Sequence, residues 1–227
     1  MKTVIITGAG GNLGTAVVKK FLDSGYRVIA GDAGVVSPGG DHPHFEGMQV
    51  DLTNAAAAKS WVDSCISRYK TVEAGLLLVG GFTMGDFAST SMEDLKKQLA
   101  LNFETAYNMA HPLFMHMMQN GYGRLIFVGA RPALDSSAGK NIVAYSLSKS
   151  LLFKLAELLN AAAKGKNVTA TVVVPSTIDT PQNRSGMPEA NPENWVKASQ
   201  IAGLMEMICS ETGLPLRETV LKIYNNA

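Results

Sequence analysis

Short apolar runs alternate with longer amphipathic stretches along this chain. Runs of strand length, rich in β-branched and other apolar residues, occupy Thr3–Thr7, Arg27–Gly31, Met48–Val50, Ala74–Val79, Arg124–Val128, Val168–Val174 and Thr219–Ile223. Several of these runs are apolar throughout, which is typical of strands that helices cover on both faces. Helical patterns separate the runs at Leu13–Ser24, Ala55–Tyr69, Met92–Asn120, Ile142–Lys164 and Trp195–Ser210. The alternation predicts an α/β fold, with a doubly wound parallel sheet, right-handed crossovers and helices on both faces.

The composition limits which partners the protein can bind and in which cellular compartment it is expected. The 227 residues are enough for one large domain, and no stretch resembles a linker or a repeat, so residues 1–227 are expected to form a single domain. A formal net charge of +1 gives no electrostatic footprint for nucleic acid or for an anionic membrane surface. No apolar run approaches the ~20 residues of a membrane span, and no secretory signal precedes the first strand. Cys65 and Cys209 are expected to be buried thiols, so a soluble, cytoplasmic protein is predicted.

A glycine-rich turn follows the first predicted strand and opens the first predicted helix. It reads Thr7-Gly8-Ala9-Gly10-Gly11-Asn12-Leu13-Gly14. Glycines let the backbone turn tightly and approach a pyrophosphate, which then lies on the helix N-terminus. The turn therefore predicts a dinucleotide site, and the alternative is a plain glycine-rich turn. The residues expected to contact the cofactor here are Gly8, Gly11, Asn12, Leu13 and Gly14.

Two carboxylates follow the second and third predicted strands. Asp32 stands 18 residues after Gly14, where an acidic side chain accepts hydrogen bonds from the adenosine ribose and repels a 2′-phosphate. No Lys or Arg occurs between Arg27 and Lys59 to bind such a phosphate. NAD(H) is therefore predicted over NADP(H), unless Asp32 is only a solvated turn residue. Asp51 ends the third strand and is expected to meet the adenine amino group.

Tyr145 and Lys149 are candidates for the chemistry. They lie four residues apart in a predicted helix and so share a face. Tyrosine is a poor acid or base near neutrality, because its reference pKa is ~10. A nearby ammonium in a partly dry site is expected to lower that pKa. An ordinary surface Tyr–Lys pair is the alternative, and the glycine-rich turn argues against it.

These residues together carry a family resemblance. The glycine turn, Asp32, Asp51, Asn102, Tyr145-x-x-x-Lys149 and Pro175-Ser176-x-x-x-Thr180 resemble the short-chain dehydrogenase/reductase family over essentially the whole chain. The resemblance implies a seven-stranded Rossmann-like sheet, a proton-relay water held by Asn102, and Thr180 at the nicotinamide carboxamide. It also implies a homodimer or homotetramer built from the helices Met92–Asn120 and Ile142–Lys164. The further cofactor contacts expected are Leu52, Gly80, Gly81, Tyr145, Lys149, Pro175 and Ile178.

The chain departs from the family pattern at a serine. Typical members place a serine at the end of the fifth strand to polarise a substrate carbonyl, and the register puts Ala130 there. Ser136 or Ser137 in the following loop is a candidate replacement. Typical members also have Asn-Asn-Ala-Gly after the fourth strand, where this chain has Leu78-Val79-Gly80-Gly81.

One branch of the family looks more similar. The segments Gly80–Phe82, Gly129–Asp135 and Asp179–Ala190 resemble dihydropteridine reductases, which also lack the serine and prefer NADH. That branch has a tryptophan after the Gly-Gly pair, where this chain has Phe82, a smaller ring that can still stack on a pterin. The substrate contacts implied by this resemblance are Phe82, Ala130, Asn183 and Arg184.

Three functions follow from these observations. The first is an NADH-dependent reductase of a quinonoid dihydropterin or a similar conjugated imine, in which Tyr145 relays the proton, Lys149 tunes Tyr145 and grips the ribose, and Asn102 holds the water chain. The second is a general carbonyl or alcohol oxidoreductase, in which Ser136 or Ser137 replaces the missing serine. The third is a non-catalytic NAD(H)-binding redox sensor that regulates a partner.

Two remaining segments are interpreted more plainly. Ser176–Asn194 is a long polar loop and is predicted to be a substrate lid, in which Arg184 either pairs with an anionic substrate or caps the loop. Asp41, His42, His44 and Glu46 are interpreted as a solvated loop, so no metal is expected.

Overall fold

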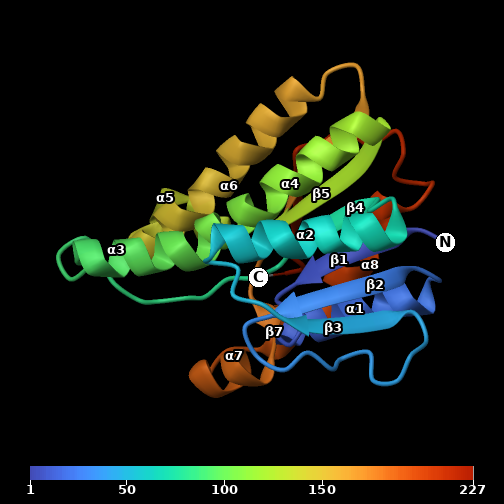
Figure 1. Ribbon diagram of the computed structural model, residues 1–227. Helices are drawn as coiled ribbons and strands as arrows, with labels where there is room; N and C mark the ends of the chain where they lie inside the picture. The colour runs from blue at the N-terminus through green and yellow to red at the C-terminus, as the bar shows by residue number, and fades with distance from the viewer. Residues whose placement is uncertain (227) are drawn as a thin grey trace.

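A seven-stranded parallel sheet forms the centre of the computed structural model, which describes residues 1–226 (Figure 1). The strand order is β3-β2-β1-β4-β5-β6-β9, as the Rossmann-like expectation requires. The order reverses between β1 and β4, and ligands bind at such a point, outside the carboxyl ends of the strands. The strands are β1 (Thr3–Thr7), β2 (Arg27–Asp32), β3 (Phe45–Gln49), β4 (Ala74–Leu77), β5 (Tyr122–Val128), β6 (Asn167–Pro175) and β9 (Val220–Ile223).

Helices cover both faces of the sheet, which confirms the predicted fold class (Figure 1). Alternation along β1 shows the two layers, because Ile5 belongs to one buried cluster and its neighbours Val4 and Ile6 belong to the other. One layer holds α2 (Ala55–Tyr69), α4 (Thr105–Asn120) and α6 (Val143–Ala162), and the other holds α1 (Asn12–Asp23) and α8 (Ala198–Cys209).

The predicted helix over Met92–Asn120 is not continuous. It consists of α3 (Met92–Leu99), a π-helical turn η1 (Ala100–Glu104) and α4. Such a turn holds one residue more than an α-helical turn and commonly marks a functional position. The amphipathic pattern of the stretch does not reveal the extra residue, because both flanking helices keep their own apolar faces.

The predicted polar loop Ser176–Asn194 is largely folded. It contains the short strand β7 (Ile178–Asp179), the helix α7 (Pro181–Gly186) and the 3₁₀ turn η3 (Pro192–Asn194). β7 pairs in parallel with β8 (Val196–Lys197), so the base of the loop is closed by main-chain hydrogen bonds. Two more short pieces follow β5, namely η2 (Arg131–Ala133) and α5 (Ser136–Gly139).

Two other expectations concern burial and membranes. Cys65 and Cys209 are buried free thiols, as predicted. Among the described residues, no helix has both the length and the apolar character needed to cross a bilayer.

Candidate active site

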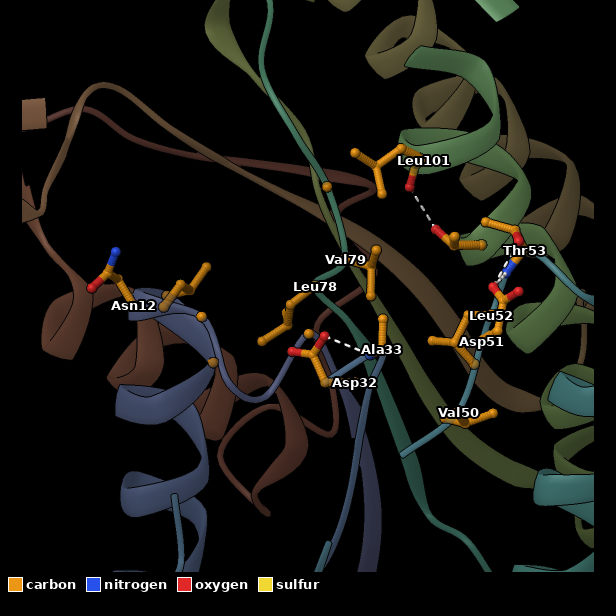
Figure 2. A pocket seen from close by; sticks show the side chains of 16 residues that line it. Asn12, Asp32, Ala33, Val50, Asp51, Leu52, Thr53, Leu78, Val79 and Leu101 are labelled. Atoms are coloured by element: carbon orange, nitrogen blue, oxygen red, sulfur yellow. Dashed lines mark hydrogen bonds between the residues drawn. The ribbon is translucent and has the colours of Figure 1, made fainter. Parts of the chain in front are cut away.

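A cavity of about 370 Å³ opens at the carboxyl ends of β1, β2 and β4, where the strand order reverses (Figure 2). Figure 2 shows Asp32 at the end of β2, with the glycine turn and Asn12 on one side and Asp51 on the other. Most of the predicted cofactor contacts from the first half of the chain meet here. The lining residues that the sequence predicted are Gly8, Gly11, Asn12, Leu13, Gly14, Asp32, Asp51, Leu52 and Gly80.

The glycine turn has the close packing that a cofactor cradle needs. Gly8 has a φ of +66°, and a Cβ there would lie 2.9 Å from the Val79 amide nitrogen. A Cβ on Gly14 would lie 2.1 Å from the Gly8 carbonyl oxygen, so α1 can start this close to β1 only with glycine. Gly11 caps α1 without a side-chain hydrogen bond. The first-turn N–H groups of α1 are therefore open to an anionic group, and the turn fits a dinucleotide pyrophosphate.

Asp32 is tied to the glycine turn. One carboxylate oxygen accepts from the Gly10 amide at 3.0 Å. The other accepts from the Ala33 amide at 2.7 Å, as Figure 2 shows. Each oxygen keeps a free lone pair, because a carboxylate has about four acceptor positions. The side chain therefore can accept ribose hydroxyls while it stays anchored to the loop beneath them.

Asp51 lies on the opposite wall of the cavity and is exposed. It accepts from the Thr53 hydroxyl at 2.6 Å and from the Thr53 amide at 2.9 Å. These hydrogen bonds hold the pKa of the Asp51 carboxyl below its usual value. Asn108 of α4 donates to the Leu52 carbonyl at 3.0 Å and fixes the segment that carries both residues.

Asn102 is fully buried in the π-helical turn and joins three segments. Its Oδ1 accepts from the Gly81 amide at 3.0 Å, and its Nδ2 lies 3.1 Å from the Gly81 carbonyl oxygen. Nδ2 also donates toward Gln98 at 2.9 Å and toward the Ser148 hydroxyl at 3.1 Å. The expected relay asparagine is thus bonded to the chain just after β4.

Lys149 points from α6 toward the ends of β4 and β5. Its ammonium donates to the Val128 carbonyl at 2.9 Å, and a Cβ on Gly80 would lie 3.0 Å from Nζ. The same Cβ would lie 2.7 Å from Asn102 Oδ1, so glycine is needed where the chain passes between the two side chains. Burial lowers the pKa of Lys149 to about 8.

The expected lowering of the Tyr145 pKa is not found. Burial instead raises the pKa of Tyr145 to about 12, because the loss of water around the phenol disfavours its anion. The Lys149 ammonium is engaged by the Val128 carbonyl, and desolvation outweighs any attraction between the ammonium and a phenolate. Tyr145 is therefore a neutral phenol at neutral pH.

Phe82 packs against Tyr145. The ring centroids lie 5.2 Å apart at an interplanar angle of 71°, an edge-to-face contact. Phe82 is 61% exposed, so one face of the ring is available beside the phenol. Ala130 is buried just after β5, whereas Ser136 and Ser137 are exposed on α5.

The predicted substrate residues of the lid are engaged with the lid itself. Asn183 donates its side-chain amide to the Ile178 carbonyl at 2.8 Å, and Thr180 caps α7 by accepting from the Asn183 amide at 3.1 Å. Arg184 forms a bidentate pair with Asp179, with N–O distances of 2.6 and 2.9 Å. Of the two roles proposed for Arg184, the structure therefore shows the one within the loop.

Sequence reasoning missed three side chains of this region. Gln98 and Ser148 bind Asn102, and Gln182 of the lid accepts from the Asn12 side chain at the glycine turn. The spacing of four residues between Gln98 and Asn102 was a readable signal, but its importance depends on the π-helical turn. The contact between Asn12 and Gln182 spans 170 residues and has no signature in the sequence.

No metal site was expected from the sequence. In the part of the chain that the structure describes, no group of three or more His, Cys, Asp or Glu side chains is arranged to hold a metal ion. His42 and His44 meet edge to face with ring centroids 5.7 Å apart, and their loop is mostly exposed.

Comparisons with known proteins point in one direction. The family model for short chain dehydrogenases matches residues 2–191. A dihydropteridine reductase of Dictyostelium discoideum is 25% identical over 225 residues, which cover 97% of this chain and 94% of that protein. The 3-oxoacyl-(acyl-carrier-protein) reductase MabA of Mycobacterium tuberculosis is 25% identical over 232 residues, or 98% of this chain and 91% of that protein. Among solved structures, an NAD⁺-bound xylitol dehydrogenase matches with a TM-score of 0.85 at 15% identity, over 99% of this chain and 98% of that one.

Proposed function

The chain belongs to the short chain dehydrogenase family, and from this premise we propose that it is an NADH-dependent reductase of a quinonoid dihydropterin or a similar conjugated imine. Membership makes it an oxidoreductase that uses a nicotinamide cofactor and acts on a small molecule. The pterin substrate and the preference for NADH are the parts we propose.

The observation that carries the substrate proposal is that the site has Ala130 in place of the serine and also has an exposed aromatic ring, Phe82. A ketone gains alkoxide charge during hydride transfer, and losing one donor to that oxygen typically costs ~10²–10³ in rate. Ala130 supplies no hydroxyl after β5. A conjugated imine spreads its developing charge over a ring, and the exposed ring of Phe82 beside Tyr145 suits a planar substrate. The similarity to a dihydropteridine reductase supports the same substrate class.

The residues that line the cavity at the carboxyl ends of β1, β2 and β4 are the proposed cofactor site. A nicotinamide cofactor supplies the hydride when it is bound. The first turn of α1 would hold the pyrophosphate, and Asp32 would accept the adenosine ribose hydroxyls and reject a 2′-phosphate. Lys149 would hold the nicotinamide ribose, and Pro175, Ile178 and Thr180 would approach the carboxamide from the base of the lid.

Tyr145 is the proposed proton donor. Its raised pKa keeps the phenol protonated at neutral pH, and this is the form that a reductase needs. The proton would leave the phenol oxygen only when negative charge develops on the substrate beside it. Asn102, which we retain as the residue that holds a relay water, keeps the chain after β4 in place.

Restoring the serine tests the substrate proposal. In Ala130→Ser, turnover of a 3-oxoacyl thioester should rise about tenfold or more, because a donor now faces the carbonyl oxygen. Turnover of quinonoid dihydropterin should stay within about twofold of wild type, a change below 0.5 kcal/mol. Initial rates of NADH oxidation with both substrates measure this, and an equal effect on both would contradict the proposal.

A general carbonyl or alcohol oxidoreductase is the second candidate. The equal identity to a 3-oxoacyl-(acyl-carrier-protein) reductase favours it. In that case Ser136 or Ser137 would have to swing from the exposed face of α5 to the substrate. Substituting both serines by alanine should then abolish carbonyl turnover, and unchanged rates would exclude this candidate.

A non-catalytic redox sensor is the third candidate. Ala130 motivates it, while Tyr145, Lys149 and Asn102 argue against it. NADH binding without hydride transfer to any acceptor would favour it over both enzyme functions.

Assembly and location complete the proposal. We expect a homodimer or homotetramer in the cytoplasm, with residues 1–227 forming one domain. The exposed apolar side chains of α4 and α6 support self-association, and two buried free thiols suit a reducing compartment.

A further inference from the structure

A buried side-chain amide, that of Gln98, is hydrogen-bonded to Asn102. Gln98 is 8% exposed and sits in the last turn of α3, four residues before Asn102. Its Oε1 accepts from Asn102 Nδ2 at 2.9 Å. A buried acceptor of this kind costs free energy unless it is bonded, so the Gln98 carbonyl and the Asn102 amide hold each other in place.

Asn102 in turn fixes the chain after β4 by bonding both the amide N–H and the carbonyl oxygen of Gly81. Oδ1 accepts from the Gly81 amide at 3.0 Å, while Nδ2 faces the Gly81 carbonyl at 3.1 Å. Only one orientation of the Asn102 amide satisfies both, because a rotated amide would set two donors against each other. Phe82 is the next residue, and its ring contacts Tyr145.

The π-helical turn explains why Asn102 needs support. Its backbone sits in a π-helical turn between α3 and α4, where the spacing of the main-chain hydrogen bonds changes from four residues to five. Ser148 provides one further acceptor at 3.1 Å, and its own hydroxyl donates to the Tyr145 carbonyl at 2.8 Å. Gln98 is the side-chain acceptor that comes from α3, so it sets the rotation of the Asn102 amide relative to the helix before the turn.

We propose that Gln98 is a positioning residue for the substrate: acting through Asn102 and Gly81, it fixes Phe82 relative to Tyr145. The proposal rests on the proposed function only where Phe82 is taken as the surface on which the substrate packs. The chain of contacts from Gln98 to Gly81 does not depend on which substrate is reduced.

Two substitutions of Gln98 separate the effect of its hydrogen-bond acceptor from the effect of its side-chain volume. Gln98→Met keeps a similar unbranched shape and removes the acceptor, whereas Gln98→Glu keeps an acceptor at the same place. Gln98→Ala is a second removal variant if Gln98→Met does not fold. Asn160→Leu is the matched control, because Asn160 also bonds main chain, at 2.8 Å to both the Ala170 carbonyl and amide, and neither residue lines the cavity at the glycine turn.

The first readout is amide hydrogen exchange at Gly81, followed by NMR without any substrate. Exchange of the Gly81 amide should be about three- to tenfold faster in Gln98→Met, the range for losing one hydrogen bond. It should be unchanged in Gln98→Glu and in Asn160→Leu. Unchanged exchange in Gln98→Met would overturn the proposal, whatever the protein reduces.

The second readout is steady-state kinetics with the best acceptor of the wild-type enzyme. KM for the acceptor should rise about three- to tenfold in Gln98→Met, and by a larger factor than KM for NADH. In a Phe82→Leu background the same substitution should change KM for the acceptor by less than about twofold, because Gln98 acts through Phe82. Equal rises in both KM values, or full additivity with Phe82→Leu, would overturn the positioning role.

The two hypotheses fail in different ways. If a carbonyl proves to be the best acceptor, the pterin proposal fails. The kinetics of the Gln98 variants are then measured with that carbonyl as the acceptor. If quinonoid dihydropterin is reduced but Gln98→Met behaves like wild type in both readouts, the pterin proposal stands and the positioning role fails.

Discussion

At the scale of single residues, burial moves the pKa values of Tyr145 and Lys149 in opposite directions. The phenol becomes a weaker acid, with a pKa of about 12, and the ammonium loses its proton more easily, with a pKa of about 8. Both shifts favour the neutral form of the side chain, as desolvation requires. A protonated Tyr145 beside an ionised Lys149 is therefore the state below about pH 8, and it is suited to giving a proton.

Removing the phenol hydroxyl should stop proton delivery without disturbing the cofactor site. In Tyr145→Phe we expect kcat to fall about 10²–10⁴-fold, the usual contribution of a positioned proton donor. The Kd for NADH, measured by fluorescence titration, should stay constant. Tyr107→Phe is the control, because Tyr107 is exposed on α4; full turnover by Tyr145→Phe would exclude the proposed donor.

The pH dependence of NADH capture should follow the ionisation of the Lys149 ammonium. Since its pKa is lowered to about 8, the ammonium is lost as the pH rises through that value, and kcat/KM for NADH should fall there. Lys149→Arg should keep the plateau up to about pH 10, because guanidinium stays charged. A wild-type profile that is flat between pH 7 and 9, to within about twofold, would contradict a role for the ammonium in holding the ribose.

The contribution of Lys149 to the stability of the fold changes with pH in the opposite direction to its contribution to NADH capture. Between about pH 8 and the unfolded-state pKa of ~10.4, the unfolded chain binds more protons at this residue than the folded chain does. The free energy of unfolding should therefore rise with pH across this window, while kcat/KM for NADH falls. Denaturant unfolding at pH 7.5 and about pH 9.5, for wild type and Lys149→Met, measures the difference.

At the same scale, sequence reasoning located side chains better than it described their surroundings. It put Asp32, Asp51 and the glycine turn at one site, because motif spacing and strand ends determine that arrangement. It gave the wrong direction for the Tyr145 pKa, because the sequence shows the nearby lysine but not the burial. Gln98 was missed because its hydrogen bond depends on the rotation of one irregular turn.

At the scale of elements, the start of α1 depends on one glycine. A Cβ on Gly14 would overlap the Gly8 carbonyl, 2.1 Å away, whereas a Cβ on Gly203 in α8 would meet no atom within 4 Å. Gly14→Ala should destabilise the protein by about 1–3 kcal/mol and weaken NADH binding, because α1 must shift away from β1. Gly203→Ala, the matched control, should stabilise it by about 0.4–1 kcal/mol.

Chemical denaturation and NADH titration check this pair of variants. If Gly14→Ala were as stable as Gly203→Ala and bound NADH normally, the close contact between α1 and the glycine turn would not be what builds the cofactor site. A loss of stability in Gly203→Ala would instead mean that the space beside α8 is filled.

The elements themselves were mostly readable from the sequence. All seven predicted strands of the main sheet exist, and α2 has the predicted bounds, because apolar runs and helical periodicity report burial directly. The break between α3 and α4 was not readable, since a π-helical turn leaves both apolar faces in register with their own helices. The lid was predicted as a loop because β7 and β8 are each two residues long, too short to show a pattern.

At the scale of the whole molecule, α4 and α6 each carry exposed apolar side chains. Tyr107 and Met115 lie on α4 and are about half exposed, as is Leu147 on α6, with Leu151 one turn further along. Such side chains support the proposed self-association. Met115→Glu combined with Leu151→Glu should convert an oligomer to a monomer in light scattering after gel filtration.

The control for the assembly variant is Phe87→Glu. Phe87 is 87% exposed and lies in the segment before α3, outside α4 and α6. It should leave the oligomeric state unchanged. A wild-type protein that is monomeric at micromolar concentration, or an oligomer that survives both glutamates, would contradict assembly through α4 and α6.

We propose that this enzyme passes a hydride from NADH to a conjugated imine and needs no serine to do so. The most direct test is the initial rate of NADH oxidation by wild-type protein with quinonoid dihydropterin, beside NADPH and a panel of ketones and aldehydes. With NADH as the cofactor, we predict that the pterin is turned over at least about 100-fold more efficiently than any carbonyl, the scale of one missing oxyanion donor. Turnover of the pterin should be less efficient with NADPH than with NADH. Efficient turnover of ketones without turnover of the pterin would contradict the account and assign the chain to the carbonyl reductases.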